Sequence, residues 1–345
     1  MRAMAIAQAR VKATIQSTWK GSTSIKWRDA MAYLENDRIT LKYLRMGQVV
    51  GEDVFPFSSL IDIGIKIPDE LKLDPPQLPH FGMKFYVPGS GEKTLVLTIG
   101  SNLLIYDEKA FKTFIHRVFE VLINGVKVKL LLARMRGGAL NMDAKWEDGT
   151  LRIVTVRSVR KNRRERNIIV LTSEGKPIPL FSDMEDLDIE EIEMGNKKVE
   201  AWKIKHFYEN ESVVSYLFVE DKKVRLYILR YLLTYRKDYV ELLIKASEEF
   251  PTIKAEFQEE LERELKELGG LDEMEQQVLM ALYSGMDPLT LHEMFGISEK
   301  ELEEIYDRLI DKGLLKLVMI RKVVDLTREG RKLVNKLMKY SMGAM

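Results

Sequence analysis

The chain has 345 residues, of which 46% are hydrophobic and 31% charged, and its formal net charge is +1 at pH 7. This length allows two or three domains with cores of their own, and the balanced charge fits neither a nucleic-acid coat nor a disordered tail. The lack of cysteine excludes disulfides, thiolate zinc sites and cysteine nucleophiles, and suits a reducing cytosol. The opening residues are too broken in hydrophobicity for a secretory signal, and no stretch has the roughly 18 apolar residues of a transmembrane segment.

The first part of the chain alternates with the period of β-strands. DAMAYLENDRITLKYL, VFPFSSLIDIGIKI and KTLVLTI read as strands separated by turn dipeptides such as Asn36-Asp37. From Asp107 the spacing becomes helical, and Gly125 provides a stop. The apolar face of this predicted helix comprises Phe111, Phe114, Ile115, Val118, Phe119 and Leu122.

The same order of elements then recurs. The corresponding segments are YLENDRITLKY (33–43) and KWEDGTLRIVT (145–155), FPFSSLIDIGIKI (55–67) and IPLFSDMEDLDIEEIEM (178–194), and IYDEKAFKTFIHRVFEVLI (105–123) and FVEDKKVRLYILRYLLTY (218–235). A repeat of about 110 residues indicates a domain duplication rather than a solenoid. Since a curled sheet closed by a C-terminal helix is the plan of pleckstrin-homology (PH)-like barrels, the sequence predicts an α+β protein with two tandem PH-like β-barrel domains, at 1–128 and 129–248.

A helical linker is predicted over 249–270, with an interruption near Pro251. It carries one narrow apolar stripe among Glu and Lys residues. The stripe either packs on its own chain or forms a seam with a second copy, and its spacing by four leads us to expect a homodimer. The stripe residues are Ile253, Phe257, Leu261 and Leu265.

Residues 271–345 predict a winged helix-turn-helix domain. LDEMEQQVLMALYSG reads as the first helix, and PLTLHEMFG as a short second helix starting at Pro288. The third helix begins at a capping box formed by Ser298 and Glu301, and the helix ends at Gly313. LLKLVMIRKVVDL supplies the two strands of a wing, and Thr327 opens a last helix.

The third helix, which normally reads DNA in this fold, is acidic. Residues 271–311 contain eleven acidic and two basic side chains, whereas residues 312–345 contain nine basic and two acidic ones. DNA binding depends on Lys and Arg near phosphates and on close approach of this helix. Leu302, Ile305 and Leu309 should face inward. The side chains that then point outward are Glu303, Glu304, Asp307 and Asp311. We therefore expect this domain to bind protein and not DNA.

No catalytic, cofactor or metal site is expected. The histidines His80, His116, His206 and His292 lie in separate segments without metal-ligand spacing. The run from Pro88 to Thr94 is not a phosphate-binding loop, because it joins two strands as a hairpin turn. The chain is therefore not expected to be an enzyme.

A basic loop in the second predicted barrel is a candidate binding element. It could bind an anionic lipid head group or an acidic protein, or it could be only solvated. The loop contains six basic residues and one acidic residue, Glu165. The basic residues are Arg157, Arg160, Lys161, Arg163, Arg164 and Arg166.

The chain as a whole resembles the archaeal taxis adaptor family CheF. The resemblance rests on FPFSSLIDIGIKI, on its counterpart IPLFSDMEDLDIEEIEM, and on a winged helix ending in LTREGRKLV. It implies a cytoplasmic, non-enzymatic adaptor that links phosphorylated CheY to the switch complex at the base of the archaellum. The alternatives are a winged-helix DNA-binding transcription regulator and a lipid-anchored scaffold.

The last helix is the candidate CheY-binding element. A receiver domain has an acidic phosphorylation pocket, so its partner should offer apolar anchors flanked by positive charge. The same helix could instead only close the winged domain. The candidate residues are Arg331, Lys332, Leu333, Lys336, Leu337, Lys339 and Tyr340.

Overall fold

The computed structural model describes residues 5–16, 25–73, 77–102, 105–136, 139–140, 145–157, 164–209, 211–236, 239–319, 323–327, 329–331 and 333–334. The chain is α+β, as predicted, and divides into an N-terminal unit (1–258) and a C-terminal unit (259–345). The finer division into four segments stays a prediction.

The first module of the N-terminal unit is an antiparallel sheet followed by one helix. Its seven strands run in the order β4-β3-β2-β1-β7-β6-β5. Helix α1 (Glu108–Ile123) starts where Asp107 accepts a hydrogen bond from the Ala110 N–H, and it buries the predicted phenylalanines. The strands are β1 (Ala7–Gln16), β2 (Arg28–Leu34), β3 (Arg38–Arg45), β4 (Gln48–Pro56), β5 (Leu60–Ile65), β6 (His80–Val87) and β7 (Gly91–Thr98), with 3-10 turns at Phe57–Ser59 and Asp69–Leu71.

The second module repeats this plan. Its main sheet has the order β12-β11-β10-β8-β15-β14-β13, which matches the first when β8 replaces β1 and β10 replaces β2. Helix α2 (Lys222–Tyr235) is capped by Asp221 as α1 is by Asp107. The strands are β8 (Lys127–Arg136), β9 (Ala139–Leu140), β10 (Glu147–Arg157), β11 (Arg164–Thr172), β12 (Pro177–Pro179), β13 (Met184–Met194), β14 (Lys197–Tyr208) and β15 (Glu211–Phe218).

One of the three predicted correspondences was out of register by a strand. The segment 33–43 spans the β2–β3 turn, but 145–155 lies mainly inside β10, the counterpart of β2. Aligning the two segments residue by residue sets the turn dipeptide Asn36-Asp37 against Asp148 and Gly149, but Gly149 is not in a turn. It lies within β10, where a Cβ atom would come 2.4 Å from a methyl group of Val170. The other two pairs fall on equivalent elements.

The predicted closed barrels were wrong, because both sheets are open. Among the described strands, β4 and β5 end one sheet and β12 and β13 end the other, with no pairing between the ends. The two equivalent edges differ. Strand β4 and its preceding turn expose four apolar side chains, whereas β12 has three residues and begins and ends with proline. The exposed side chains are Met46, Val49, Val50 and Val54.

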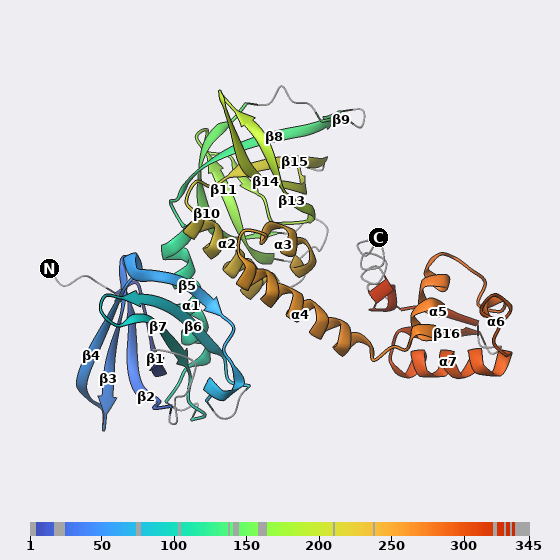
Figure 1. Cartoon of the computed structure of the whole chain (residues 1–345), viewed down its shortest axis with the longest axis horizontal. Coiled ribbons are helices and arrows are strands. Elements are labelled where there is room, and N and C mark those ends of the chain that lie inside the picture. The colour runs from blue at the N-terminus through green and yellow to red at the C-terminus, as the bar shows by residue number, and fades with distance from the viewer. Residues whose placement is uncertain are drawn as a thin grey trace. The chain divides into compact units, whose positions relative to one another are not determined.

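Helices α1 and α2 lie between the two sheets (Figure 1). Helix α1 contacts β1 and β10, and α2 contacts β5 of the first module. The two helices meet through aromatic rings: Phe119 lies edge-on to Tyr231 at 5.6 Å between centroids, and His116 lies edge-on to Tyr235 at 5.6 Å. The duplicated modules are therefore joined by their closing helices.

A buried ion network fixes α2 against the first sheet. The Arg230 side chain is 0% exposed, and its Nε and Nη2 donate to the two carboxylate oxygens of Asp62 on β5 at 2.9 and 2.6 Å. The same guanidinium donates to Glu256 in helix α4 (Pro251–Gly269). Burial alone would lower the pKa of Arg230, but these hydrogen bonds outweigh it and raise that pKa.

The C-terminal unit has the predicted order of three helices and a hairpin. Ser298 and Glu301 form the expected capping box at α7, and Gly313 has a φ of +70° after the helix. The second helix begins at Leu291 rather than Pro288. Pro288 lies in the preceding turn, where its carbonyl accepts a hydrogen bond from Tyr306. The elements are α5 (Glu273–Tyr283), α6 (Leu291–Phe295), α7 (Glu299–Asp311), β16 (Leu315–Met319) and β17 (Val323–Leu326), preceded in the N-terminal unit by α3 (Val240–Ala246).

We predict that Asp62→Ala destabilises the protein far more than Asp186→Ala at the equivalent position of β13. Asp62 compensates the buried Arg230, whereas Asp186 is 52% exposed and pairs with Lys245. Removing one partner of a buried pair should lower the free energy of unfolding by about 3 kcal/mol, and the exposed change should cost less than about 0.5 kcal/mol. Urea unfolding of the full chain, followed by tryptophan fluorescence, measures both. Equal losses would contradict the role given to Arg230.

Candidate functional site

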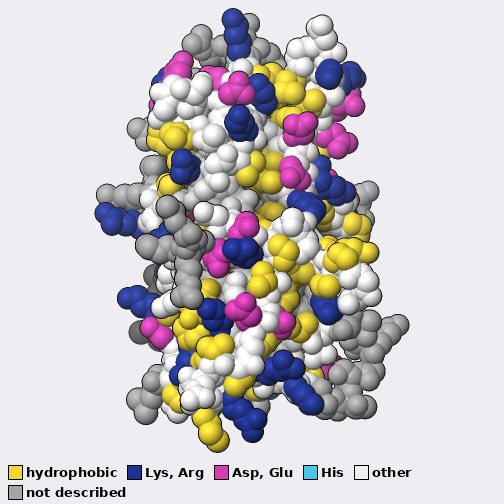
Figure 2. Space-filling view, turned by 90° about the vertical axis from the view of Figure 1, so that its left-hand side faces the viewer, with side chains coloured by type: hydrophobic (Ala, Val, Ile, Leu, Met, Phe, Trp, Pro, Cys, Tyr) yellow, Lys and Arg dark blue, Asp and Glu magenta, His cyan; other side chains and the backbone are white. Residues whose placement is uncertain are grey.

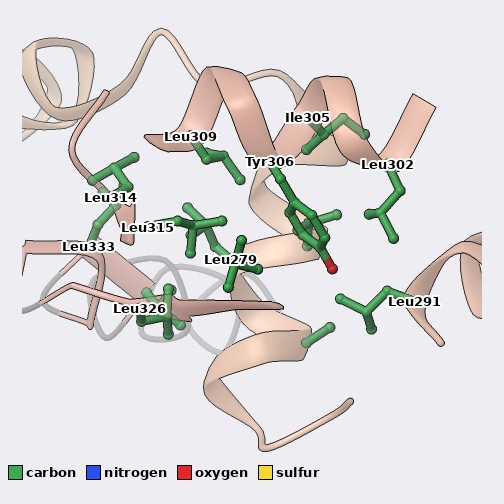
Figure 3. Close-up of a cluster of buried hydrophobic side chains, with 14 residues drawn as sticks. Leu279, Leu291, Leu302, Ile305, Tyr306, Leu309, Leu314, Leu315, Leu326 and Leu333 are labelled. Carbon is green, nitrogen blue, oxygen red and sulfur yellow. The ribbon is translucent and has the colours of Figure 1, made fainter. Parts of the chain in front are cut away.

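Helix α7 carries an acidic outward face above an apolar core, as predicted. Leu302, Ile305 and Leu309 are buried, with Leu291, Leu279 and Leu326 packed in the same cluster (Figure 3). On the opposite side of the helix four carboxylates are exposed. They are Glu303, Glu304, Asp307 and Asp311.

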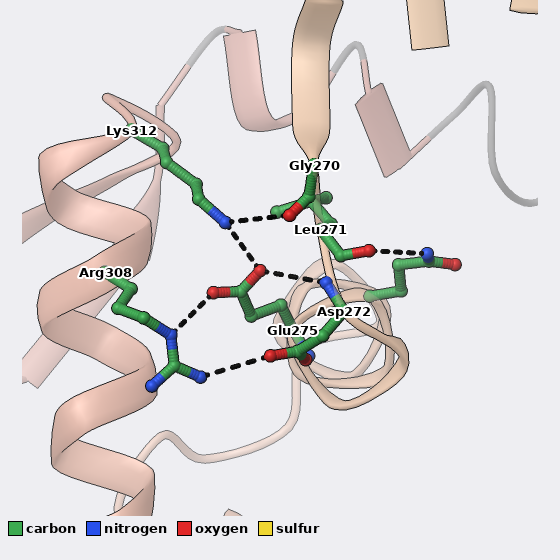
Figure 4. A network of polar contacts seen from close by, with 7 residues as sticks. Gly270, Leu271, Asp272, Glu275, Arg308 and Lys312 are labelled. Atoms are coloured by element: carbon green, nitrogen blue, oxygen red, sulfur yellow. Dashed lines mark hydrogen bonds and ion pairs between the residues drawn. The ribbon is translucent and has the colours of Figure 1, made fainter. Parts of the chain in front are cut away.

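The basic residues of this region bind a buried carboxylate. Glu275, only 1% exposed, accepts hydrogen bonds from Arg308 Nε at 2.8 Å and Lys312 Nζ at 2.7 Å (Figure 4). Arg308 also lies 3.3 Å from Asp272, which forms a capping box with Glu275 at the start of α5. Burial alone would raise the pKa of Glu275, but bonds from Lys312, Arg308 and the Asp272 N–H lower it overall.

This network explains how the helix can be so strongly acidic on its surface. Of the three cations between residues 299 and 312, Arg308 and Lys312 are bonded to Glu275. Glu275 was not among the predicted residues, although its spacing of three from Asp272 is a capping-box signal. The exposed charge of α7 is therefore more negative than its composition indicates.

Exposed apolar side chains lie in the same unit and were also missed. Met286, Leu289 and Met294 are 45%, 54% and 48% exposed, in the turn before α6 and on α6 itself. They fall outside the helical period of α5 and α7, so periodicity gave no reason to select them. Figure 2 shows another face of the molecule, the left-hand side of Figure 1. There, exposed hydrophobic side chains are dispersed among Lys, Arg, Asp and Glu.

The structure describes the basic loop only in part. Arg160, Lys161 and Arg163 lie outside the described residues, and Arg157 is described only in its backbone, which pairs with Arg164. Arg164 and Arg166 belong to strand β11 and are exposed. The Arg166 guanidinium lies over the Tyr235 ring at 5.5 Å, so one member of the set contacts α2 rather than the loop.

The apolar stripe of the linker is already covered by the chain itself. Ile253, Phe257 and Leu261 are at most 3% exposed, and the side chain of Leu265 lies outside the described residues. The spacing by four, from which we expected a homodimer, does not mark a free surface, because Ile253 and Phe257 are buried. Glu256, which lies between them in α4, is bonded to Arg230. A seam with a second copy would require these residues to leave their present contacts.

The described part of the last helix packs inward. Leu333 is 1% exposed in the core of the C-terminal unit, while Arg331 is exposed and lies 3.0 Å from Asp325. The burial of Leu333 agrees with the alternative interpretation, in which this helix closes the C-terminal domain. The remaining candidates lie outside the described residues: Lys332, Lys336, Leu337, Lys339 and Tyr340.

The histidines occupy separate places. His206 is buried against Ser215 at 2.8 Å, and burial lowers its pKa to about 4. The rings of His80, His116 and His292 lie on other elements, and the described residues contain no cluster of three side chains suited to a metal ion. Within the same residues, no helix is long and apolar enough to cross a membrane.

We predict that Glu275→Gln weakens the C-terminal unit and flattens its response to acid. Because the pKa of Glu275 is lowered in the folded state, its stabilisation is complete above the ordinary glutamate pKa of about 4.3 and is lost as the pH falls through the lowered value. The variant should lose about 1–3 kcal/mol at pH 7. Hydrogen exchange of α5 and α7 amides measures this, with the exposed Glu273→Gln as control; an unchanged pH profile would contradict it.

Two family models match the chain. That of the archaeal chemotaxis signal transduction system protein F matches residues 5–237, and a domain of unknown function (DUF8579) matches residues 270–339. A curated relative, "Taxis protein CheF1" of Halobacterium salinarum, is 37% identical over 65 residues; the match covers 19% of this chain and 22% of that relative. Since the first model covers both modules, this chain belongs to the archaeal chemotaxis signal transduction system protein F (CheF) family.

Proposed function

We propose that this protein is a non-enzymatic adaptor that links phosphorylated CheY to the switch complex of the archaellum motor. Membership of a chemotaxis signalling family and the name of the taxis relative support this role. The observation that carries it is the exposed carboxylate face of α7, which suits protein contacts and repels nucleic acid. We place the adaptor in the cytoplasm at the base of the archaellum.

We also propose the finer fold assignments. The open seven-stranded order followed by a helix supports a PH-like topology for each module, although neither sheet closes. The three helices and hairpin of the C-terminal unit support a winged helix-turn-helix. Both are folds on which unrelated functions occur, so the exposed surfaces rather than the folds indicate the function.

The alternative, a DNA-binding transcription regulator, has the charge of α7 against it. Base reading would bring Glu303, Glu304 and Asp307 close to phosphates, and the nearby Arg308 and Lys312 are bonded to Glu275. Arg321 and Lys322, the cations expected in the wing, lie outside the described residues.

The end of the last helix is our proposed contact for CheY. Burial of Leu333 leaves Leu337 and Tyr340 as the apolar anchors, with Lys336 and Lys339 as flanking charges. The cations should raise the association rate and the anchors should slow dissociation. Homodimerisation also stays a proposal, but Ile253, Phe257 and Leu261 no longer support it.

We predict no measurable binding of a fluorescent DNA duplex at ~150 mM salt. Replacing Glu303, Glu304 and Asp307 by lysine should create salt-sensitive binding, because it turns the exposed face of α7 positive. Fluorescence anisotropy measures both proteins. Tight binding by the unchanged chain that is lost with Arg321→Glu and Lys322→Glu would favour the regulator instead.

We predict that the full chain binds CheY carrying a phosphoryl mimic, and that deletion after Asn335 abolishes binding. Lys336→Glu with Lys339→Glu should weaken it at least about tenfold, with strong salt dependence, because the acidic receiver pocket loses its counter-charges. Calorimetry measures the affinities, and a pull-down from archaeal lysate identifies motor proteins held with and without the mimic.

The matched control is Lys197→Glu with Lys198→Glu, an exposed basic pair at the start of β14. It should leave CheY binding unchanged. If the truncated chain binds CheY with undiminished affinity, the assignment to the last helix is wrong, and the basic residues around Arg164 become the next candidate.

A further inference from the structure

A pocket of about 310 Å³ lies where the two modules meet in the N-terminal unit. Its walls come from β5, β6 and α1 of the first module and from β11 and α2 of the second. This volume is at the lower end of the range for small-molecule sites, about 300–1,000 Å³. The pocket therefore suits a small molecule rather than a peptide segment or a polymer.

The pocket is positive. Two of its lining side chains are the cations Lys112 of α1 and Arg166 of β11, and no carboxylate is among the described residues that line it. Lys112 has a surface partner, Glu108, at 2.5 Å. Arg166 lies over the Tyr235 ring and presents a planar set of donors, which matches carboxylate or phosphate oxygens.

The neighbouring polar side chains Tyr235 and His80 are uncharged at neutral pH. Burial raises the pKa of Tyr235 to about 12 against the opposing effect of Arg166, so its hydroxyl keeps its proton at neutral pH. His80 adds no charge: burial lowers its pKa, its Nε2 accepts from the Leu73 N–H at 2.8 Å, and its Nδ1 faces the Leu78 carbonyl. The positive charge of the pocket is thus concentrated on Lys112 and Arg166.

The rest of the lining is apolar. Ile65, Pro79, Phe81 and Ile115 contribute hydrocarbon surface beside the cations. A bare inorganic ion would leave this surface in contact with water, whereas a ligand with a compact apolar group would cover it. The lining therefore favours an organic anion over a free ion.

We propose that this pocket binds a small organic anion, in which a carboxylate or phosphate group contacts Arg166 and Lys112 and an apolar body packs on Ile65, Phe81 and Ile115. The ligand would touch both modules beside the Arg230–Asp62 pair, since Gly64 follows Asp62 on β5 and Thr234 follows Arg230 by one turn of α2. Binding would thus stabilise the junction of the modules. This site is independent of the proposed CheY contact.

Calorimetry on the full chain tests the proposal with phenyl phosphate and benzoate as probes, and with inorganic phosphate and benzyl alcohol as partial ligands. We expect at least one of the two complete probes to bind and to raise the midpoint of thermal unfolding. Arg166→Gln should weaken binding at least about tenfold, because a charge-assisted bidentate contact is lost. Preference for phenyl phosphate or benzoate would distinguish a phosphate from a carboxylate ligand.

Two exposed cations on the same elements provide matched controls. Arg164→Gln on β11 and Lys109→Gln on α1 lie outside the pocket lining and should leave the affinity unchanged. We expect a Kd of about 1 mM or tighter. If neither complete probe binds at concentrations up to about 10 mM, roughly ten times this Kd, the proposal is overturned. Equal weakening by Arg164→Gln would also overturn it, because it would mean unspecific attraction by surface charge. The midpoint of thermal unfolding without ligand serves as the check that each variant is folded.

Discussion

The N-terminal unit depends on keeping the guanidinium of Arg230 charged in its interior. Arg230 cannot lose its proton, and an isolated charge there would cost several kcal/mol, so it must have carboxylates within bonding distance. Asp62 and Glu256 meet that demand from two different elements. The planar group thus ties α2 to β5 through Asp62 and to α4 through Glu256. Apolar contacts alone would tolerate a sliding of these helices that the ion network does not.

Local signals predicted the local structure well. The helical stripe around Phe111, the capping box of Ser298 with Glu301 and the inward face of α7 depend on residues within one or two turns of one another, and each was found as expected. The exposed turn at Gly89, which only superficially resembled a phosphate-binding loop, likewise proved to be a hairpin between β6 and β7. The repeat was visible because the strand patterns and the helical segment that follows them recur in the same order.

What failed depended on contacts between distant segments. Asp62 lies 168 residues from Arg230, so nothing near either residue marks the pair. The alignment set Gly149 against Asp37 of a turn, but here the glycine makes room for Val170 on the next strand. Ile253 and Phe257 looked like a free seam because the surface that covers them is built by other elements. The pocket beside Arg166 was invisible for the same reason, although its cation had been noticed.

The two outer edges of the duplicated sheets have different consequences for assembly. Strand β12, short and bounded by Pro177 and Pro179, has too few free N–H groups to template another strand. Strand β4 is nine residues long and places Val49, Val50 and Val54 in solvent. Of these two equivalent edges, only β4 is therefore long enough to pair with a strand of another chain, so association through these edges would involve the first module and not the second.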